Sequence, residues 1–336
     1  MQEFLLSMLE CPLCHGDLRW RIEAGEAGCI DTATATCTDC EATYPIREGI
    51  GLFLTPELPR DDLWEQVGSN LSHFLDTNPD TARALLDGPL DALNPADQFL
   101  RAMALEDRGE FAAARRATAS AWPGLYTPEY RTCAEQQLRF VVDQVNAQDS
   151  DAPIVDIACG RGQLIERLAE HTTRPIVATD FSPRVLRRNR RYFEHLHCCD
   201  QVNFLACDAR LTPFKTGAVQ VMTSNLGLQN ISEPGNLLAE LRRVLNPEGV
   251  FLAISYFYPP DDVANEPKLT EYGLLDILER ERALELFRAA GWQVELASTC
   301  TGYAQPTPTS GILGMGIDGL PVAPTTLTWG TVVARG

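Results

Sequence analysis

Long apolar runs are missing from this sequence: no stretch approaches the roughly 20 residues that a membrane-spanning helix needs. The first residues, MQEFLLSMLECP, lack a basic flank and a small-residue cleavage site, so we expect no secretory signal. Basic residues are also scarce, because 28 Lys and Arg stand against 46 Asp and Glu, for a formal net charge of −18. This balance argues against a non-specific nucleic-acid surface, although one local basic patch stays open. We therefore expect a cytoplasmic protein with no membrane segment.

The stretch PIVDIACGRGQL, residues 153 to 164, has the pattern of a strand, a tight turn and a helix. Gly160 and Gly162 have no Cβ, so the backbone there can turn sharply and approach a ligand closely. Open α/β sheets hold nucleotide-like cofactors at such turns. The third glycine of the NAD-binding pattern is absent, because Ile165 occupies its position. An NAD-binding domain, or a plain α/β domain whose acids cap turns, remains the alternative at this point.

Two later apolar runs each end in an acid. RPIVATDFS (174–182) contains Asp180, and VNFLACDAR (202–210) contains Asp208. An acid about 20 residues beyond the glycine turn is positioned to bind ribose hydroxyls. The spacing of these runs indicates successive strand and helix units of a parallel sheet.

With these acids and the G-x-G turn, residues 150–300 resemble a class I S-adenosylmethionine-dependent methyltransferase. The segment NLLAELRRVLNPEGVFLAIS (236–255) resembles the helix, turn and fifth strand of that family. The resemblance implies an α/β fold with a seven-stranded Rossmann-like sheet and S-adenosylmethionine as cofactor. The usual Pro-Gly-Gly turn of the family reads Pro247, Glu248, Gly249 here. Three departures stand out: Ala158 replaces the first motif glycine, Cys159 occupies a variable position, and the strand at 219–221 lacks its usual acid.

The same resemblance implies the contacts of the cofactor, with the ribose on Asp180 and the adenine edge beside Asp208. The expected cofactor-binding residues are Tyr130, Asp156, Ala158, Cys159, Gly160, Gly162, Asp180, Phe181, Asp208, Ala209, Asn225 and Leu226.

The acceptor should lie where the loops after the fourth and fifth strands meet. From these loops the candidates for positioning it are Asn225, Tyr256, Tyr258 and Asp261. A sulfonium methyl group is already activated, so alignment supplies much of the acceleration. We therefore expect no catalytic triad and assign no catalytic residue.

Two Cys-x-x-Cys pairs, Cys11 with Cys14 and Cys37 with Cys40, predict a metal site near the amino terminus. Each pair presents two sulfurs to one ion, and four thiolates without an open position predict a structural zinc ion. The 11 cysteines are a small share of a long chain, which favours metal binding over a disulfide framework. Competing ligands would be Cys29 and His15, and unligated cysteines are the other alternative.

The sequence around these cysteines resembles the small zinc-ribbon activator subunit of tRNA and release-factor methyltransferases. The two stretches that carry the resemblance are LLSMLECPLCHGDL and TCTDCEATYPIREGIGLFL. The resemblance includes the segment from Tyr44 to Ile50. It implies a ribbon that docks on a methyltransferase, here within one chain, and leaves room for a protein partner bound through the ribbon.

Size and composition predict two or three domains, since the 336 residues are 45% hydrophobic. We expect a zinc ribbon at 1–57, a helical linker and cap at 58–125, and a methyltransferase domain at 126–336. The stretch PELPRDD (56–62) is typical of a linker. The Gly-, Pro- and Thr-rich segment 302–325 either covers the acceptor pocket or forms a surface hairpin.

Two features leave alternatives open. Tyr126, Tyr130 and Arg131 precede the first strand and either reach the cofactor's methionine carboxylate or the acceptor, or pack on the sheet edge. The five arginines of residues 184–191 form a dense basic cluster, which either contacts a substrate phosphate or is a solvated helix face.

The favoured function is an S-adenosylmethionine-dependent methyltransferase acting on a small molecule or another non-nucleic acceptor. The first alternative is a methyltransferase of RNA or of a translation protein, which the relatives of the ribbon suggest. The second is a non-catalytic adaptor that pairs a zinc ribbon with a cofactor-binding domain.

Overall fold

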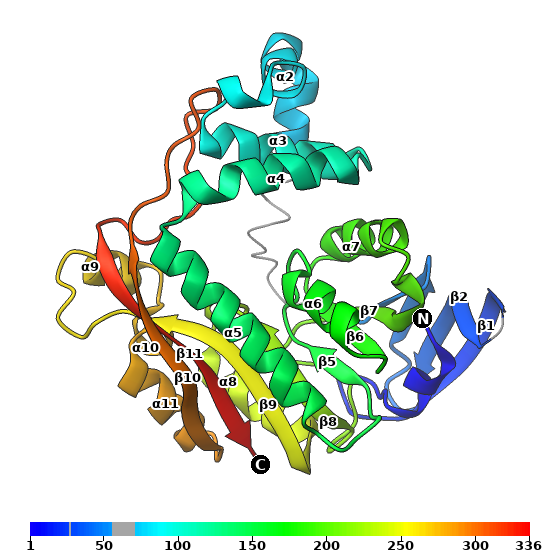
Figure 1. Ribbon diagram of the computed structural model, residues 1–336. Helices are drawn as coiled ribbons and strands as arrows, with labels where there is room; N and C mark the ends of the chain where they lie inside the picture. Colours follow the sequence, from blue (N-terminus) through cyan, green and yellow to red (C-terminus); the bar gives the residue numbers. More distant parts are fainter. Residues whose placement is uncertain (27, 56–70) are drawn as a thin grey trace.

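The computed structural model describes residues 1–26, 28–55 and 71–336, and its named strands form one sheet (Figure 1). The strands are β1 (Leu18–Glu26), β2 (Cys29–Cys37), β3 (Thr43–Arg47), β4 (Ile50–Leu52), β5 (Ile154–Asp156), β6 (Ile176–Asp180), β7 (Val202–Ala206), β8 (Val219–Asn225), β9 (Leu245–Phe257), β10 (Gln293–Ala304) and β11 (Thr325–Arg335). Their order across the sheet is β1-β2-β3-β4-β7-β6-β5-β8-β9-β11-β10. The strands from β4 to β9 run parallel, and β11 and β10 continue antiparallel at one edge.

Helices cover both faces of the parallel part. The helices are α2 (Pro79–Leu86), α3 (Pro95–Asp107), α4 (Phe111–Leu125), α5 (Pro128–Asn146), α6 (Gln163–His171), α7 (Pro183–His195), α8 (Pro234–Val244), α9 (Glu266–Glu271), α10 (Leu275–Leu278) and α11 (Arg280–Ala289), with 3-10 turns η1 (Glu3–Ser7), η2 (Leu90–Ala92), η3 (Cys199–Gln201) and η4 (Leu228–Asn230). Ile154 packs with the helices α5, α6 and α7, while its neighbour Val155 packs with α8 and α11, because successive strand residues point to opposite faces. The strands β5, β6 and β7 are buried throughout, as parallel strands covered on both faces must be. In the described ranges, no helix combines the length and the apolar character needed to cross a bilayer.

The amino-terminal strands extend the central sheet, which corrects the predicted strand count. The seven predicted strands are present, in the order β7-β6-β5-β8-β9-β11-β10. In addition, β4 pairs in parallel with β7 and connects β3, β2 and β1 to the same sheet, which therefore has eleven strands rather than seven. Without β4, the outer edge of β7 would present unpaired backbone groups. Phe53 stacks on Tyr44 with ring centroids 5.2 Å apart, in the same core cluster as Leu205 and Phe214. The ribbon and the central domain therefore share one sheet and one core.

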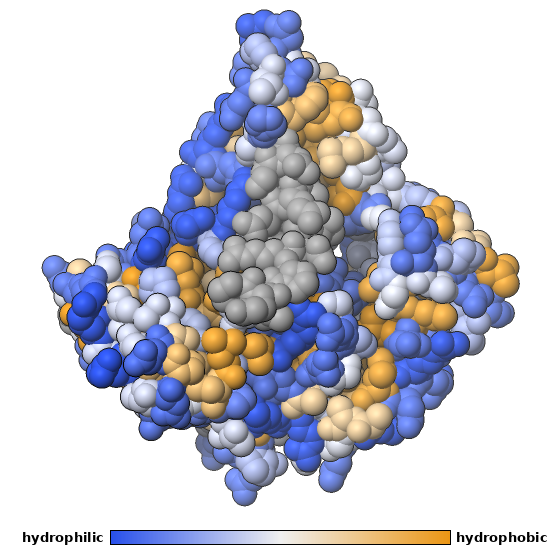
Figure 2. All heavy atoms as spheres, turned by 180° about the vertical axis from the view of Figure 1, so that it is seen from behind, coloured by the Kyte–Doolittle hydropathy of each residue, from blue (hydrophilic) through white to orange (hydrophobic). Residues whose placement is uncertain are grey.

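The helices α2, α3 and α4 form a cap that stands above the carboxyl ends of the strands (Figure 1). Within the predicted helical cap, α3 and α4 form a hairpin that turns at Gly109. The predicted linker 56–62 and residues 63–70 of the predicted cap lie outside the described residues. Seen from behind, the flank of this upper part carries a gathering of apolar side chains (Figure 2).

The segment between β10 and β11 packs against the cap. Ile312 and Leu313 join the apolar cluster of α3 and α4, and Asp97 of α3 accepts hydrogen bonds from the Ser310 hydroxyl and from the Gly311 N–H at 3.0 Å. This segment is therefore no free surface hairpin, because it ties the sheet to the cap.

Ion pairs between α3 and α7 fasten the cap to the central domain. Glu106 pairs with Arg161 and with Arg188, whose Nη2 lies 2.7 Å from its carboxylate, and Asp107 pairs with Arg184 at 2.5 Å. Two arginines of the predicted basic cluster on α7 are thus ion-paired with acids of the cap.

Candidate functional site

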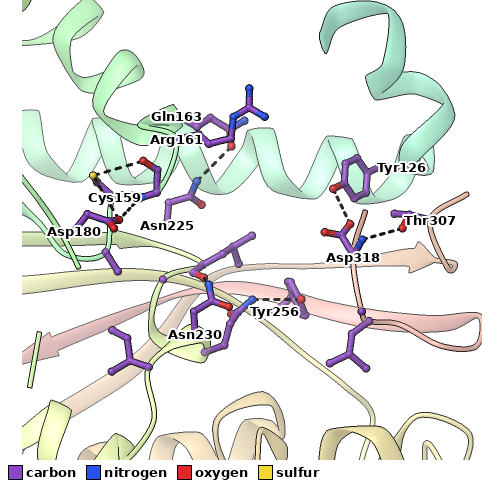
Figure 3. A pocket seen from close by; sticks show the side chains of 18 of the residues that line it. Tyr126, Cys159, Arg161, Gln163, Asp180, Asn225, Asn230, Tyr256, Thr307 and Asp318 are labelled. Atoms are coloured by element: carbon purple, nitrogen blue, oxygen red, sulfur yellow. Dashed lines mark hydrogen bonds between the residues drawn. The ribbon is translucent and has the colours of Figure 1, made fainter. Parts of the chain in front are cut away.

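A cavity of about 1070 Å³ lies between the cap and the carboxyl ends of the parallel strands. Its floor comes from the loops after β5, β6, β7, β8 and β9, and its roof from α3, α4, α5 and the segment before β11. Open α/β sheets bind ligands at this edge. Figure 3 shows Asp180 and Cys159 at one end of the cavity, Asn225 and Tyr256 near its middle, and Tyr126 and Asp318 at the other end.

The turn after β5 forms the end that holds Asp180. Gly160 and Gly162 adopt φ values of +49° and +79°, which L-residues other than glycine rarely do. One carboxylate oxygen of Asp180 accepts the Gly160 N–H at 2.8 Å, and the other accepts the Ser182 N–H at 3.0 Å. Asp180 therefore fixes the turn and faces the cavity together with it.

Most of the residues expected at the site line the cavity. Those that do are Tyr130, Ala158, Cys159, Gly160, Asp180, Phe181, Asp208, Ala209, Asn225, Leu226 and Tyr256. Four of the expected residues are outside the lining. Gly162 turns toward the Phe193 ring, Tyr258 is buried, and Asp261 is exposed on the loop after β9.

Asp156, the fourth, lies beneath the turn. It accepts a hydrogen bond from the Thr223 hydroxyl at 2.6 Å and is 1% exposed. Burial, only partly opposed by Thr223 and reinforced by the charge of Asp180, raises the pKa of Asp156 to about 7. Asp156 therefore does not line the cavity in this structure, and its predicted contact with the cofactor stays a prediction.

This pKa predicts a pH dependence of stability. When the pKa of an acid is raised in the folded state, the free energy of unfolding falls as pH rises from the ordinary pKa of 3.8 to the folded-state pKa of about 7. Asp156→Asn removes this titration, so between these pH values the variant should lose up to about 4 kcal/mol less than the wild type does. Urea unfolding at several pH values measures it, with the exposed Asp149→Asn as control. Parallel wild-type and Asp156→Asn curves would contradict the assignment.

Asp208 at the tip of β7 is engaged by its neighbour. Arg210 Nη2 lies 2.7 Å from the carboxylate, and the Arg210 N–H donates to it at 2.8 Å. A ligand amino group at this position would share the carboxylate with Arg210.

The far end of the cavity was only partly predicted. Tyr126 and Tyr130, stacked with centroids 4.7 Å apart, both line the cavity, and Tyr130 also packs edge-on against Trp329 at 4.9 Å. The predicted packing on the sheet is thus present for Tyr130, and contact of these residues with the cofactor or the acceptor stays a prediction. Asp318 was missed, since only the unusual composition of residues 302–325 pointed to its segment.

The four predicted cysteines come together in the ribbon. Their sulfurs all lie within 4.8 Å of one another, with Cys14 and Cys37 3.4 Å apart and Cys11 and Cys40 3.6 Å apart. Metal–sulfur bonds of about 2.3 Å in a tetrahedron place sulfurs about 3.8 Å apart, so these residues fit a tetrahedral thiolate site.

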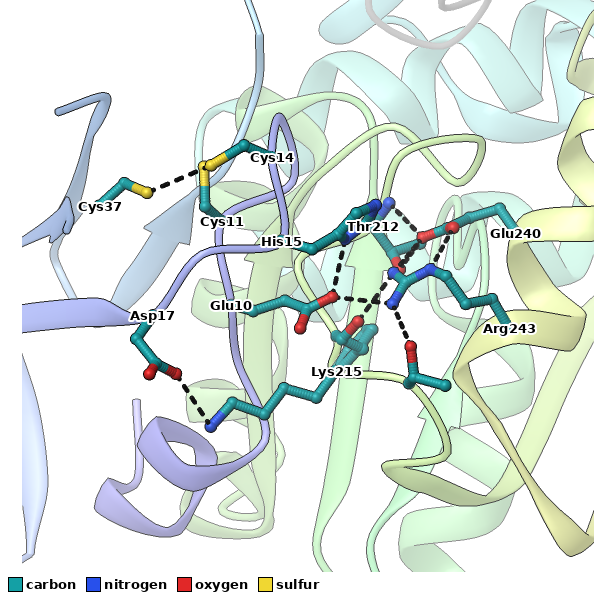
Figure 4. A network of polar contacts seen from close by, with 12 residues as sticks. Glu10, Cys11, Cys14, His15, Asp17, Cys37, Thr212, Lys215, Glu240 and Arg243 are labelled. Atoms are coloured by element: carbon teal, nitrogen blue, oxygen red, sulfur yellow. Dashed lines mark hydrogen bonds and ion pairs between the residues drawn. The ribbon is translucent and has the colours of Figure 1, made fainter. Parts of the chain in front are cut away.

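The two residues considered as competing ligands, Cys29 and His15, are not part of the four-sulfur group. The His15 ring forms a hydrogen bond with Glu10 at 2.8 Å. Glu10 in turn pairs with Arg243 of α8 at 2.8 Å, which ties the metal-site loop to the central domain (Figure 4).

Two family models match parts of the chain. Residues 154–249 match the model of a methyltransferase domain, and residues 2–49 match the model of Trm112p-like proteins. Both predicted resemblances are therefore confirmed, each on the part of the chain that suggested it.

Among curated proteins, the chain is 32% identical to a demethylmenaquinone methyltransferase of Renibacterium salmoninarum over 121 residues, which are 36% of this chain and 48% of the relative. It is 29% identical to a ubiquinone/menaquinone biosynthesis C-methyltransferase of Acidiphilium cryptum over 103 residues, 31% of this chain and 41% of the relative. The chain thus spans about half the length of the curated relatives it matches.

Solved structures were also compared. The YcgJ protein of Bacillus subtilis has a TM-score of 0.48 at 14% identity, covering 60% of this chain and 99% of that one. A putative methyltransferase of Bacillus halodurans has a TM-score of 0.47 at 18% identity, covering 59% and 97%.

Proposed function

We propose that this chain is an S-adenosylmethionine-dependent methyltransferase that acts on a small-molecule acceptor. The observation that carries the proposal is the glycine turn held by Asp180 at the mouth of a large cavity, within the region that matches a methyltransferase domain. The relatives are named for menaquinone and ubiquinone synthesis, whose products are small molecules.

The donor fits the cavity end formed by β5, β6 and β7. Asp180 would accept the ribose hydroxyls, and the adenine would lie between Phe181 and Asp208. Arg131 also lines the cavity, and its buried Nε has no hydrogen-bond partner in the described part of the chain. This guanidinium would pair with the methionine carboxylate.

The acceptor would lie on the other side of Asn225 and Tyr256. The roof formed by the cap and the β10–β11 segment leaves a cavity close in size to pockets for small ligands. A macromolecular acceptor would need an open groove, and an RNA acceptor would also need unpaired basic groups.

When bound, the donor would supply an activated methyl group on a sulfonium, and alignment with a nucleophile would be the main requirement for its transfer. Asn225 and Tyr256 then have a positioning role, and the roof keeps water out of the site. The four-cysteine site would hold structural zinc, as closed thiolate sites do. We propose the same three domains as the sequence predicts, 1–57, 58–125 and 126–336. The first and the third contribute strands to one sheet.

Asp180→Asn tests the donor site. Loss of the charge weakens hydrogen bonds to the ribose, and bonds to a charged group are worth about 1.5 to 3 kcal/mol, so the affinity for S-adenosylhomocysteine should fall roughly 10- to 100-fold. Calorimetric titration measures it. Asp200→Asn, an exposed acid on η3, should bind like the wild type. Equal affinity of all three proteins would remove Asp180 from the donor site.

Turnover tests the function as a whole. Incubation of the purified chain with methyl-labelled donor and a cell extract should transfer label to the small-molecule fraction. Label in RNA, with binding that weakens steeply with salt, would favour the RNA alternative. Donor binding without transfer to any fraction would favour the adaptor.

A further inference from the structure

Asp318 lies at the end of the cavity remote from Asp180 (Figure 3). Tyr126 Oη donates to one of its carboxylate oxygens at 2.8 Å, and its own N–H donates to Thr307 Oγ1 at 3.2 Å. Within the described residues, no hydrogen bond or ion pair holds the second oxygen. The structure therefore presents a carboxylate oxygen to the cavity without a cation beside it.

Burial makes the charged form of Asp318 costly. Burial raises the pKa of Asp318, and the hydrogen bond from Tyr126 offsets this only in part. Burial, followed by the charge of Asp318, also raises the pKa of Tyr126 and Tyr256. An anionic ligand would be repelled here, whereas a group that gives up a proton would relieve the buried charge.

The aromatic rings do not form an open cage for a cation. Tyr126 stacks on Tyr130 at 13° between the ring planes, and Trp122 packs against Tyr126 with centroids 4.6 Å apart. Trp329 meets Tyr130 edge-on. A cation binds best on an exposed aromatic face, whereas these rings pack against one another. Around them the cavity is lined by the apolar side chains of Leu274, Leu278, Leu320 and Leu327.

We propose that Asp318 binds the acceptor and takes its proton, and that the acceptor is a neutral molecule with an apolar body and a hydroxyl group aimed at Asp318. This inference rests on the proposed methyltransferase function. Asp318 is then a catalytic residue, and Tyr126 positions it.

The step balances without a further reagent. The hydroxyl proton moves to the second carboxylate oxygen of Asp318. The electron pair left on the acceptor oxygen, or conjugated from it to an adjacent ring carbon, forms the bond to the methyl carbon. The carbon–sulfur bond breaks and its pair stays on sulfur, which becomes a neutral thioether. Where the ring carbon reacts, protonated Asp318 returns its proton to the ring oxygen, and the hydrogen on the methylated carbon leaves to solvent as a proton, which restores the aromatic ring and the hydroxyl.

Binding of three naphthalene probes to the full chain, loaded with S-adenosylhomocysteine, tests the inference. Wild type should bind 2-naphthol at least roughly tenfold more tightly than 2-methoxynaphthalene, which has the same ring but no proton to donate. It should bind the cationic 1-naphthylmethylamine less tightly than 2-naphthol. Bound 2-naphthol should also show naphtholate emission, because excitation releases its proton to a nearby base.

Asp318→Asn should bring the two neutral probes to within about threefold of each other and reduce the naphtholate emission. Asp276→Asn, the same change at an exposed acid on α10, should behave like the wild type. Unchanged S-adenosylhomocysteine affinity in both variants would show that they are folded.

The inference is overturned if the amine binds most tightly, if Asp318→Asn keeps the wild-type preference, or if the loaded wild type binds no probe. Failure of the wild type to bind S-adenosylhomocysteine at all would instead sink the proposed function, and this inference with it.

Discussion

Cys37→Ser, or removal of the metal by a chelator, is expected to unfold the ribbon and to destabilise the whole chain. Binding of structural zinc is worth roughly 10 to 16 kcal/mol at neutral pH, which is comparable to the total stability of a domain. Cys37 is 1% exposed and belongs to the core cluster that also contains Leu205 and Phe214 of the central domain. Loss of the metal site should therefore destabilise the central domain as well, through the shared core.

Metal analysis and thermal unfolding followed by circular dichroism measure this effect together. Cys29→Ser is the matched control, since this exposed thiol lies on the same strand but outside the four-sulfur group. We expect the control to keep both metal and melting temperature. A wild-type protein purified without metal, with a melting temperature that a chelator leaves unchanged, would refute the assignment.

Glu106→Gln is expected to lower the free energy of unfolding by about 3 to 5 kcal/mol, the usual cost of removing one partner of a buried ion pair. Glu106 is 8% exposed, and Arg161 and Arg188 both depend on it for charge compensation. Glutamine keeps the shape but leaves two guanidinium groups close together. Arg161 also belongs to the glycine turn that lines the cavity, so loosening of the cap should reach the proposed cofactor site.

The pH dependence of this effect has a definite sign. Burial would raise the pKa of Glu106, but the two arginines outweigh burial and lower it from 4.5. A lowered folded-state pKa gives stability that is present above that value and lost as pH falls. The difference between wild type and Glu106→Gln should thus be largest near neutral pH and shrink in acid.

Urea unfolding measures both. The exposed Glu110→Gln should change stability by no more than about 0.5 kcal/mol. If Glu106→Gln were as stable as this control, the ion pairs would not be what fastens the cap.

The contact between the glycine turn and Asp180 was predictable because it is local. In the predicted parallel sheet the strand that precedes the turn lies next to the strand that ends in the acid, so Gly160 and Asp180 could be placed together from their spacing. The four cysteines were predictable for the same reason, since each pair forms one turn.

Long-range pairings were not predictable in this way. No sequence pattern predicts that β4 pairs with the edge of β7. The arginines of α7 have the pattern of a solvated face, and only the fold places Glu106 and Asp107 opposite them. Asp318 lies in an irregular segment without periodicity, and it becomes a site residue because that segment packs against the cap.

Equilibrium dialysis with labelled S-adenosylmethionine tests the donor site most directly. We expect one molecule to bind per chain, with competition by S-adenosylhomocysteine and none by NAD. Absence of saturable binding, or displacement of the label by NAD, would contradict the account.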